Sequence, residues 1–219
     1  MRMTDAVDWA ARTEAELLDA ALPLVPEFGW TSRLVAAAAK AAGLETAEAE
    51  LLLPAGARDL AALLSYRHDE AALEALSTID STALKIRERI ERAVLARIEA
   101  ALRDETAVRR LMGFLTLPPN MALGARLAWS SADVLWRWAG DVATDENHYS
   151  KRAILAGLLS STLAVRLATS PAGAQTHLDR GIDAVMAYEG FKRRFSGRDF
   201  AAETAAFLSR ARYGATPAA

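Results

Sequence analysis

The apolar residues of this chain recur three and four positions apart in one segment after another, and this spacing constrains the fold more than any other feature. Within residues 13–28, for example, Leu17, Ala21, Leu24 and Phe28 fall on one stripe of a helix. An amphipathic α-helix produces this period, whereas a half-buried strand alternates at every second residue. The chain has 219 residues, 52 % of them hydrophobic, which is enough for a substantial core. The sequence therefore predicts an all-α fold.

Prolines, glycines and capping residues divide this pattern into separate helices. Pro23 and Pro26 should kink or end the first helix, Gly43 should end the second, and Asp80 or Ser81 should cap the fifth. The expected helices cover residues 13–28, 33–43, 45–53, 57–76, 81–102, 105–117, 122–139, 145–168, 174–195 and 198–213. The break at Pro54 and Gly56 predicts an organisational boundary.

Composition and charge argue against several classes of protein. A net charge of −2 disfavours a nucleic-acid binder that relies on bulk positive charge. The absence of cysteine excludes disulfides, iron–sulfur clusters and thiolate catalysis. The acidic amino terminus is unlike a secretory or mitochondrial signal, and no apolar run approaches the ~18 residues of a spanning helix. We therefore expect a protein that stays where it is made and touches membranes only peripherally.

The first three expected helices form a recognisable arrangement. A helix ending near Gly29, a second ending at Gly43, a short third and then a proline–glycine break together resemble the amino-terminal helix-turn-helix of TetR-type repressors. In that arrangement the third helix would enter the DNA major groove, but its charged residues are Glu45, Glu48 and Glu50. Residues 1–60 carry five basic and ten acidic residues, a net charge of −5. We predict that this unit does not bind DNA.

Catalytic and metal-binding patterns are sparse. His68, His148 and His177 lie far apart in the sequence, and the pair Asp145 and His148 offers two ligands where a structural zinc site needs four. We therefore expect no metal and no cofactor. An enzyme that uses Asp145, His148 and Tyr149 as acid–base groups is a further possibility, which requires these side chains to converge on a pocket.

The segment WAGDVATDENHYSKRAILAGLLSST, residues 138–162, concentrates polar groups at the start of a helix. Asp145, Tyr149 and Arg152 share one helix face, and His148 stands one turn from Arg152. Thr144 is a good N-cap and acidic residues suit a first turn, so ordinary capping is one interpretation. The tyrosine, histidine and basic residues beside a glycine-containing loop favour a second one, an exposed recognition patch.

Two other helices also allow two interpretations. Trp129 and Trp136 share one face of their helix, whereas Trp138 lies nearly opposite, so this helix is either a central core helix or lines a cavity or a subunit interface. Aromatic and aliphatic walls of this kind suit a lipid-like ligand. The last segment, residues 198–213, is amphipathic and carries Phe200 and Phe207; it either packs on its own domain or contacts a membrane.

The segment at residues 138–162 also carries a family resemblance. Its pattern W-x-GD-x-x-TD-x-N-x-Y-x-KRA-x-L-A, from Trp138 to Ala156, resembles the most recognisable part of the ninth Coq protein family of ubiquinone biosynthesis. LPLVPEFGWT at 22–31, LPPN at 117–120 and the helix with Asp133 and Trp136 are similar to other family segments, so the resemblance covers roughly residues 13–190. Glu146 and His148 replace aromatic residues of the family pattern, which makes this patch more polar.

The resemblance implies a TetR-like fold that has lost DNA binding and is not an enzyme. It implies three parts: a helix-turn-helix-like unit at 1–56, a helical lipid-binding and dimerisation domain at 57–196, and an amphipathic helix and tail at 197–219. The protein would bind an isoprenoid quinone precursor or a phospholipid, present the precursor to a di-iron ring hydroxylase, form a homodimer and contact the bacterial inner membrane from the cytoplasm. A TetR-type regulator that senses a hydrophobic ligand is the alternative.

Three groups of residues follow from this interpretation. The expected partner-docking patch is Asp141, Thr144, Asp145, Asn147, His148, Tyr149, Lys151 and Arg152. The expected lipid-binding residues are Met112, Phe114, Leu117, Trp129, Leu135, Trp136, Trp138, Leu155, Leu158 and Leu159. The expected membrane contacts are Phe200, Phe207, Leu208 and Arg210.

Overall fold

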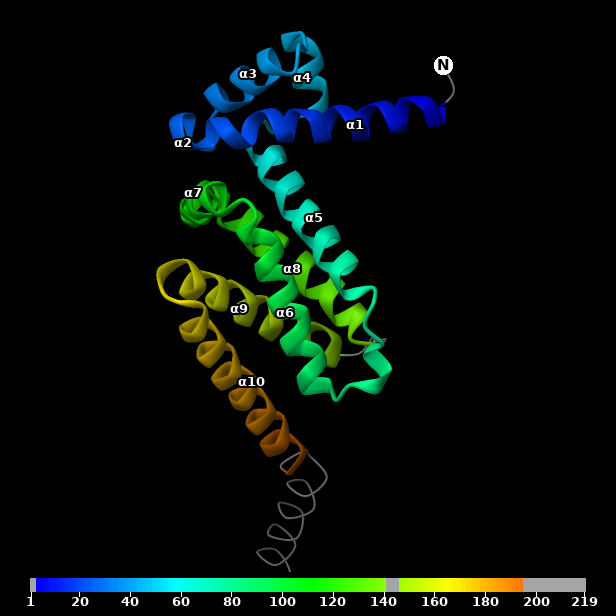
Figure 1. The fold of residues 1–219 in the computed structure, drawn as a ribbon, viewed down its shortest axis with the longest axis vertical. Coiled ribbons are helices and arrows are strands. Elements are labelled where there is room, and N and C mark those ends of the chain that lie inside the picture. The colour runs from blue at the N-terminus through cyan, green and yellow to red at the C-terminus, as the bar shows by residue number, and fades with distance from the viewer. Residues whose placement is uncertain (1–2, 141–145, 195–219) are drawn as a thin grey trace, which may run out of the picture. The chain divides into compact units, whose positions relative to one another are not determined.

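A computed structural model describes residues 3–140 and 146–194 of the chain (Figure 1). The chain forms two compact units, residues 1–178 and residues 179–219. Within the described ranges every regular element is an α-helix or a short 3-10 turn, which confirms the predicted all-α class. The expected segment 198–213, with its four predicted membrane contacts, lies outside the described residues, and the domain boundaries at 56 and 196 stay predictions.

The helices follow the predicted breaks closely. In chain order the elements are α1 Met3–Ala21, η1 Leu22–Leu24, α2 Val25–Phe28, α3 Ser32–Ala41, α4 Thr46–Leu52, α5 Ala57–Leu76, η2 Ser81–Ala83, α6 Ile86–Leu102, α7 Glu105–Thr116, η3 Pro118–Asn120, α8 Met121–Trp138, α9 Glu146–Ala168 and α10 Pro171–Arg194. Pro23 and Pro26 stand at the starts of η1 and α2, and the first helix ends at Ala21. Proline has no backbone N–H to donate to the preceding turn, so the α-helix does not continue through these positions.

Two predicted helix starts were wrong: α1 begins at Met3 and not at residue 13, and α6 begins after the expected cap at Asp80. Asp80 does cap a turn, since its carboxylate accepts a hydrogen bond from the Thr82 backbone, but that turn is the separate 3-10 element η2. Leu84 and Lys85 are extended, and α6 begins only at Ile86. There the Glu88 side chain accepts a bond from the Lys85 backbone N–H at 2.9 Å. The sequence thus offers a capping residue at both starts, Asp80 for η2 and Glu88 for α6. At the start of α6 the Glu88 carboxylate satisfies the Lys85 amide, which has no partner within the helix.

The amino-terminal helices are joined to the later ones through Trp30. Its side chain is buried, and its indole N–H donates a 3.2 Å hydrogen bond to the Ala107 carbonyl of α7. Its ring lies 6.5 Å from the ring of Phe114. Gly43 lies just after the end of α3 and has a positive φ of 70°. The backbone N–H of Leu44 donates a 2.9 Å hydrogen bond to the Ala39 carbonyl of that helix. This is the glycine cap that the sequence predicted.

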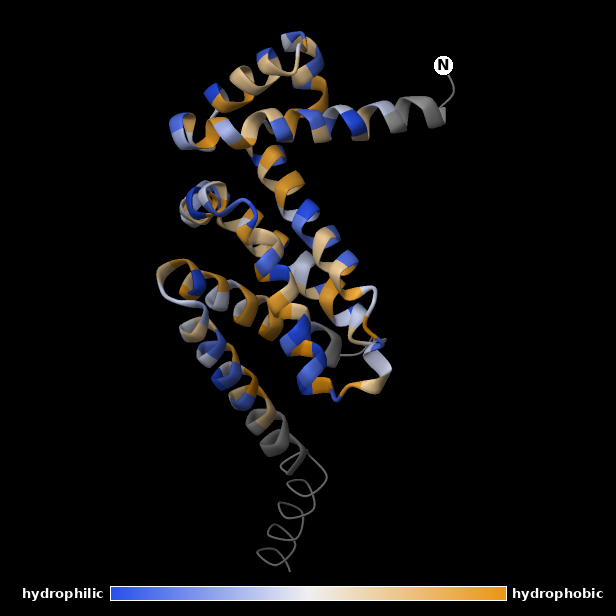
Figure 2. Ribbon diagram, in the orientation of Figure 1, coloured by the Kyte–Doolittle hydropathy of each residue, from blue (hydrophilic) through white to orange (hydrophobic). Residues whose placement is uncertain are grey.

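The remaining helices of the first unit pack around a shared interior. α5 contacts α6 and α8, α8 contacts α9, and α7 contacts both α8 and α9 (Figure 1). Arg89 of α6 donates to the carbonyl of Ala139 at 2.8 Å, which satisfies one of the free carbonyls at the end of α8. Hydrophobic and hydrophilic residues alternate along these helices (Figure 2), and no helix in the described ranges is long and apolar enough to cross a membrane.

Candidate functional site

A buried ion pair joins the start of α9 to α8. The Arg152 side chain is 2 % exposed, and its Nε donates to Asp133 Oδ1 at 2.5 Å. Arg137, one turn along α8, donates to the other oxygen of the same carboxylate at 2.8 Å. Burial raises the pKa of Asp133, but the hydrogen bonds and charges of the two arginines outweigh it and lower that pKa below its usual value. Asp133 therefore stays ionised at neutral pH and fixes Arg152 in place.

Aromatic side chains of α8 hold the neighbouring residues of α9. The Trp136 indole N–H donates to the Lys151 carbonyl at 2.9 Å, and the Lys151 ammonium lies 5.6 Å from the centre of the Trp136 ring. The Trp129 ring lies 6.1 Å from that of Tyr149. Tyr149 is nevertheless 64 % exposed. The first described turns of α9 are thus held at a defined position on α8.

The predicted docking patch is only partly present as a surface. Tyr149 is exposed and Lys151 half-buried, but Arg152 is buried, so Arg152 is not available as an exposed contact and that part of the expectation was wrong. The reason is the carboxylate of Asp133, which the neighbouring helix places beneath this turn. Asp141, Thr144 and Asp145 lie outside the described residues; Asn147 and His148 lie within α9, and their side chains are outside the description.

The predicted lipid-binding residues are spread over several environments. Leu135, Leu155, Leu158 and Leu159 are buried, Leu117 is 52 % exposed, and the remaining members are half-buried. Met112 and Leu159 line one interior cavity, whereas Phe114 lines a different, larger groove. The set therefore does not form one continuous site in this structure.

The interior cavity lies among α5, α6, α7, α8 and α9 and has a volume of about 90 Å³. Its polar side is formed by Ser65, His68, Arg97 and Ser131, all of them buried. Its other walls include Leu111, Met112, Leu115, Leu127, Leu159 and Leu163, together with the half-buried Ser160. The buried polar residues thus form one part of the lining, and the rest of it is mainly apolar.

A hydrogen-bond network holds the buried polar residues. Asp69 Oδ1 accepts from Arg97 Nε at 2.5 Å and from the Ser131 hydroxyl at 2.7 Å, while Arg97 Nη2 reaches the Ser65 hydroxyl at 3.2 Å. His68 Nε2 lies 2.9 Å from Asp104 Oδ2. Burial, and next the charge of Arg97, lower the pKa of His68 to about 4 despite Asp104. The imidazole is therefore neutral at pH 7.

Sequence reasoning missed this network. It treated His68 only as a histidine far from the other two, and it named none of Ser65, Asp69, Arg97 and Ser131. A usable signal was the run Ser-Tyr-Arg-His-Asp at 65–69 inside a helix that is otherwise rich in leucine and alanine. Several polar residues on one turn of such a helix favour a buried, mutually satisfied cluster.

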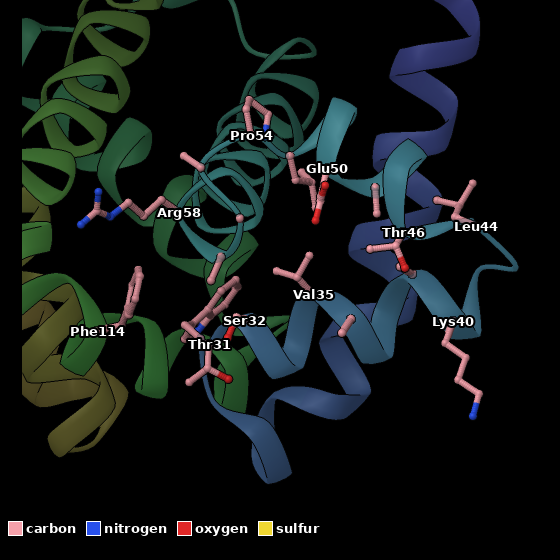
Figure 3. A pocket seen from close by; sticks show the side chains of 18 of the residues that line it. Thr31, Ser32, Val35, Lys40, Leu44, Thr46, Glu50, Pro54, Arg58 and Phe114 are labelled. Atoms are coloured by element: carbon pink, nitrogen blue, oxygen red, sulfur yellow. The ribbon is translucent and has the colours of Figure 1, made fainter.

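A larger groove of about 1060 Å³ lies in the amino-terminal part of the first unit, between α3, α4 and the start of α5. Figure 3 shows Val35 pointing into it and Lys40 extending away. At its far edge Arg58 Nε donates to the Asn120 side chain at 2.9 Å. On α4 the glutamates at 48 and 50 are exposed, as is Glu45 directly before it, so acidic groups occupy the helix that a repressor would present to DNA.

Comparison with known proteins gives matches over the same helices. Residues 121–189, which include α8, α9 and most of α10, match the COQ9 family. The chain is 32 % identical over 162 residues to the mitochondrial ubiquinone biosynthesis protein COQ9 of Rattus norvegicus, covering 70 % of this chain and 51 % of that protein. For COQ9-A of Xenopus laevis the identity is 30 % over 167 residues, covering 72 % and 51 %. For COQ9 of Homo sapiens it is 30 % over 162 residues, covering 70 % and 50 %.

The chain spans about half the length of the curated relatives that it matches. These relatives are named as mitochondrial proteins, so they give no support to the expected bacterial location. The matched region contains the helix pair built around Asp133 and Arg152, and it contains the segment whose letters carried the resemblance. The resemblance is confirmed, and the chain is a relative of the COQ9 family of ubiquinone biosynthesis proteins.

Proposed function

We propose that this protein is a non-enzymatic, lipid-binding accessory protein of ubiquinone biosynthesis. It binds an isoprenoid quinone precursor or a phospholipid and presents the precursor to a membrane-associated ring hydroxylase. The observation that carries the proposal is the similarity, over 70–72 % of this chain, to proteins named for ubiquinone biosynthesis. The cavity among α5 to α9 has leucine and methionine walls, the kind of lining that apolar ligands contact, although at about 90 Å³ it would have to widen to hold a lipid.

The start of α9 supports the docking part of the proposal. Tyr149 presents a large exposed ring on a helix that Trp136 and the Asp133–Arg152 pair hold in place. Exposed aromatic residues on a rigid support are typical anchors of protein interfaces. In this proposal Tyr149 contacts the hydroxylase, and Arg152 acts indirectly by fixing the helix that carries it.

The alternative function, a TetR-type regulator, is disfavoured by the charge on α4. A repressor gains most of its non-specific DNA affinity from basic groups that displace counterions from phosphates. Here Glu45, Glu48 and Glu50 are all exposed in the position that would face the duplex. A salt-dependent gel shift with random DNA fragments at low ionic strength would revive this alternative.

Two experiments test the proposal. Native mass spectrometry with lipid extraction, on protein purified from a ubiquinone-producing host, should find a bound isoprenoid or phospholipid and a dimer mass. Empty monomeric protein that also fails to bind added quinone precursors would refute the carrier function.

Docking is tested in cells that lack the gene for this protein. Tyr149→Ala should restore little ubiquinone although it folds, whereas Tyr66→Ala, at an exposed tyrosine on α5, should restore it fully. Equal ubiquinone levels with both variants would remove Tyr149 from the docking surface. Arg152 is unsuitable for this test, since its loss would disturb the fold as well.

A further inference from the structure

The groove between α3, α4 and the start of α5 is lined mainly by small and apolar residues. Val35, Ala36 and Ala39 line its α3 wall, Ala49 lies on its α4 wall, and Phe114 lies at one end (Figure 3). Ala36 is exposed, and Val35 and Phe114 are only half-buried, so apolar surface meets solvent along the groove. Exposed apolar surface gathered in one concave place is typical of a binding site.

The side chain of Glu50 points into this groove. Glu50 on α4 and Val35 on α3 project toward each other from opposite walls (Figure 3). Glu50 forms no hydrogen bond or ion pair with any residue that the structure describes. The basic lining residues do not compensate its charge, because Lys40 extends away from the groove and Arg58 reaches outward to the Asn120 side chain at 2.9 Å. Glu50 thus brings an uncompensated negative charge to a largely apolar groove.

The surroundings of Glu50 are acidic as well. Glu45 lines the same groove, and Glu48 is exposed on the same short helix. Residues 1–60 carry five basic and ten acidic residues, a net charge of −5. A surface of one sign attracts a partner of the opposite sign and orients it during approach. The charges therefore favour an occupant that places a basic group beside Glu50 and apolar groups against the rest of the lining.

The walls of the groove indicate the conformation of that occupant. They are formed chiefly by helices, and no strand occurs in the described ranges. Since helical walls bond their own backbone groups internally, an extended peptide would find few backbone partners there, whereas an α-helix satisfies its own. Lining residues occur along the whole of α3, from Ser32 to Lys40. The ten residues of α3 extend about 15 Å, the length of about three helical turns.

We propose that this groove binds an amphipathic α-helix of a partner protein, with the apolar face of that helix against Val35 and Phe114 and one of its lysines or arginines paired with Glu50. The occupant is protein rather than nucleic acid, because the acidic groups around the groove repel phosphates. The inference goes beyond the proposed function, since the groove shares no residue with the cavity among α5 to α9 and does not include Tyr149. It gives the protein a second docking surface.

Two synthetic helical peptides serve as probes. Each has about 14 residues on an alanine background, with leucines forming one stripe and a hydrocarbon cross-link on the opposite face to keep it helical. The basic probe carries two arginines beside the leucine stripe, and the acidic probe carries glutamates at the same two positions. NMR titration of the full chain at low ionic strength, followed at the Val35 methyl signals, gives the dissociation constant of each probe.

The key quantity is the ratio of the acidic-probe constant to the basic-probe constant. We expect a ratio of about five or more for the wild type, and a fall of about two- to fivefold in Glu50→Gln, as one exposed ion pair provides. Glu16→Gln is the matched control, because it removes the same charge from an exposed position of α1 outside the groove and should leave the ratio unchanged. Ala36→Trp adds a ring at an exposed lining position and should weaken both probes about tenfold or more.

Several outcomes would overturn the inference. If neither probe moves the Val35 methyl signals at millimolar concentration, the groove does not bind helices of this kind. If the ratio falls equally in Glu50→Gln and Glu16→Gln, the preference comes from overall charge, and the pairing with Glu50 is wrong. If N-acetylarginine amide binds as tightly as the basic probe, the groove is a site for small cations and not for a helix.

Discussion

Replacing Arg152 with alanine removes one partner of the ion pair that joins α9 to α8. Its guanidinium is almost fully buried, so the substitution leaves the Asp133 carboxylate without its main partner in a partly buried place. Removal of one partner from a buried pair costs about 3–5 kcal/mol. Asp133 keeps the hydrogen bond from Arg137 and is 23 % exposed, which places the expected loss near the lower end, about 3 kcal/mol.

Urea unfolding followed by circular dichroism measures this loss, and thermal unfolding should show a decrease in Tm of roughly 6–12 °C for a unit of this size. Arg137→Ala is the matched control, since Arg137 pairs with the same carboxylate but is 71 % exposed. An exposed pair of this kind contributes about 0.2–1 kcal/mol. If Arg152→Ala costs no more than Arg137→Ala, the argument from burial is wrong.

The pair also predicts a dependence on acid. The pKa of Asp133 is lowered in the folded protein, so its contribution to stability is present above the unfolded value, about 3.9, and is lost as pH falls through the lower folded value. The stability difference between the wild type and Arg152→Ala should therefore shrink as the pH falls below 4. A difference that stays constant down to pH 2 would mean that Asp133 is not the group that Arg152 stabilises.

Three other predictions concern separate parts of the chain. The folded pKa of His68 is about 4 against 6.5 unfolded, so wild-type stability should fall as pH drops from about 6.5 toward 4 and fall less in His68→Gln; an NMR titration of His68 near pH 6.5 would contradict this. Gly43→Ala, at a φ of 70°, should cost roughly 1–2 kcal/mol, whereas Gly113→Ala, exposed inside α7 with nothing near the added methyl, should gain about 0.5–1 kcal/mol; urea titrations that reverse this order would refute the cap assignment. Phe207→Glu should weaken sedimentation with anionic vesicles, and unchanged sedimentation would mean that the last segment does not contact the membrane.

Local rules predicted the helices well because each boundary depends on residues within a few positions of it. The first helix is interrupted at Pro23 and Pro26 and α3 is followed by Gly43, as predicted, and α5 covers the predicted residues 57–76. The predicted start of α6 was wrong because Asp80 and Glu88 are both local capping signals. Local propensity does not say which of the two begins the long helix.

The candidate site was predicted less well because its key residues meet across helices. The expected patch on α9 correctly contained Tyr149 as an exposed ring, but it also contained Arg152, whose burial depends on a carboxylate 19 positions earlier. Periodicity places residues on a face of their own helix and does not say which other helix covers that face.

What the sequence determined by itself is therefore the all-α class, most helix boundaries, the acidic character of the amino-terminal unit and the family. These follow from composition and from contacts within one or two helical turns. Only the tertiary structure decided that Arg152 is buried, that Ser65, His68, Arg97 and Ser131 converge on one cavity, and that the predicted lipid-binding residues are spread over more than one environment. Those facts depend on the packing of α5 to α9, where side chains far apart in the chain exclude water together and their charges acquire partners.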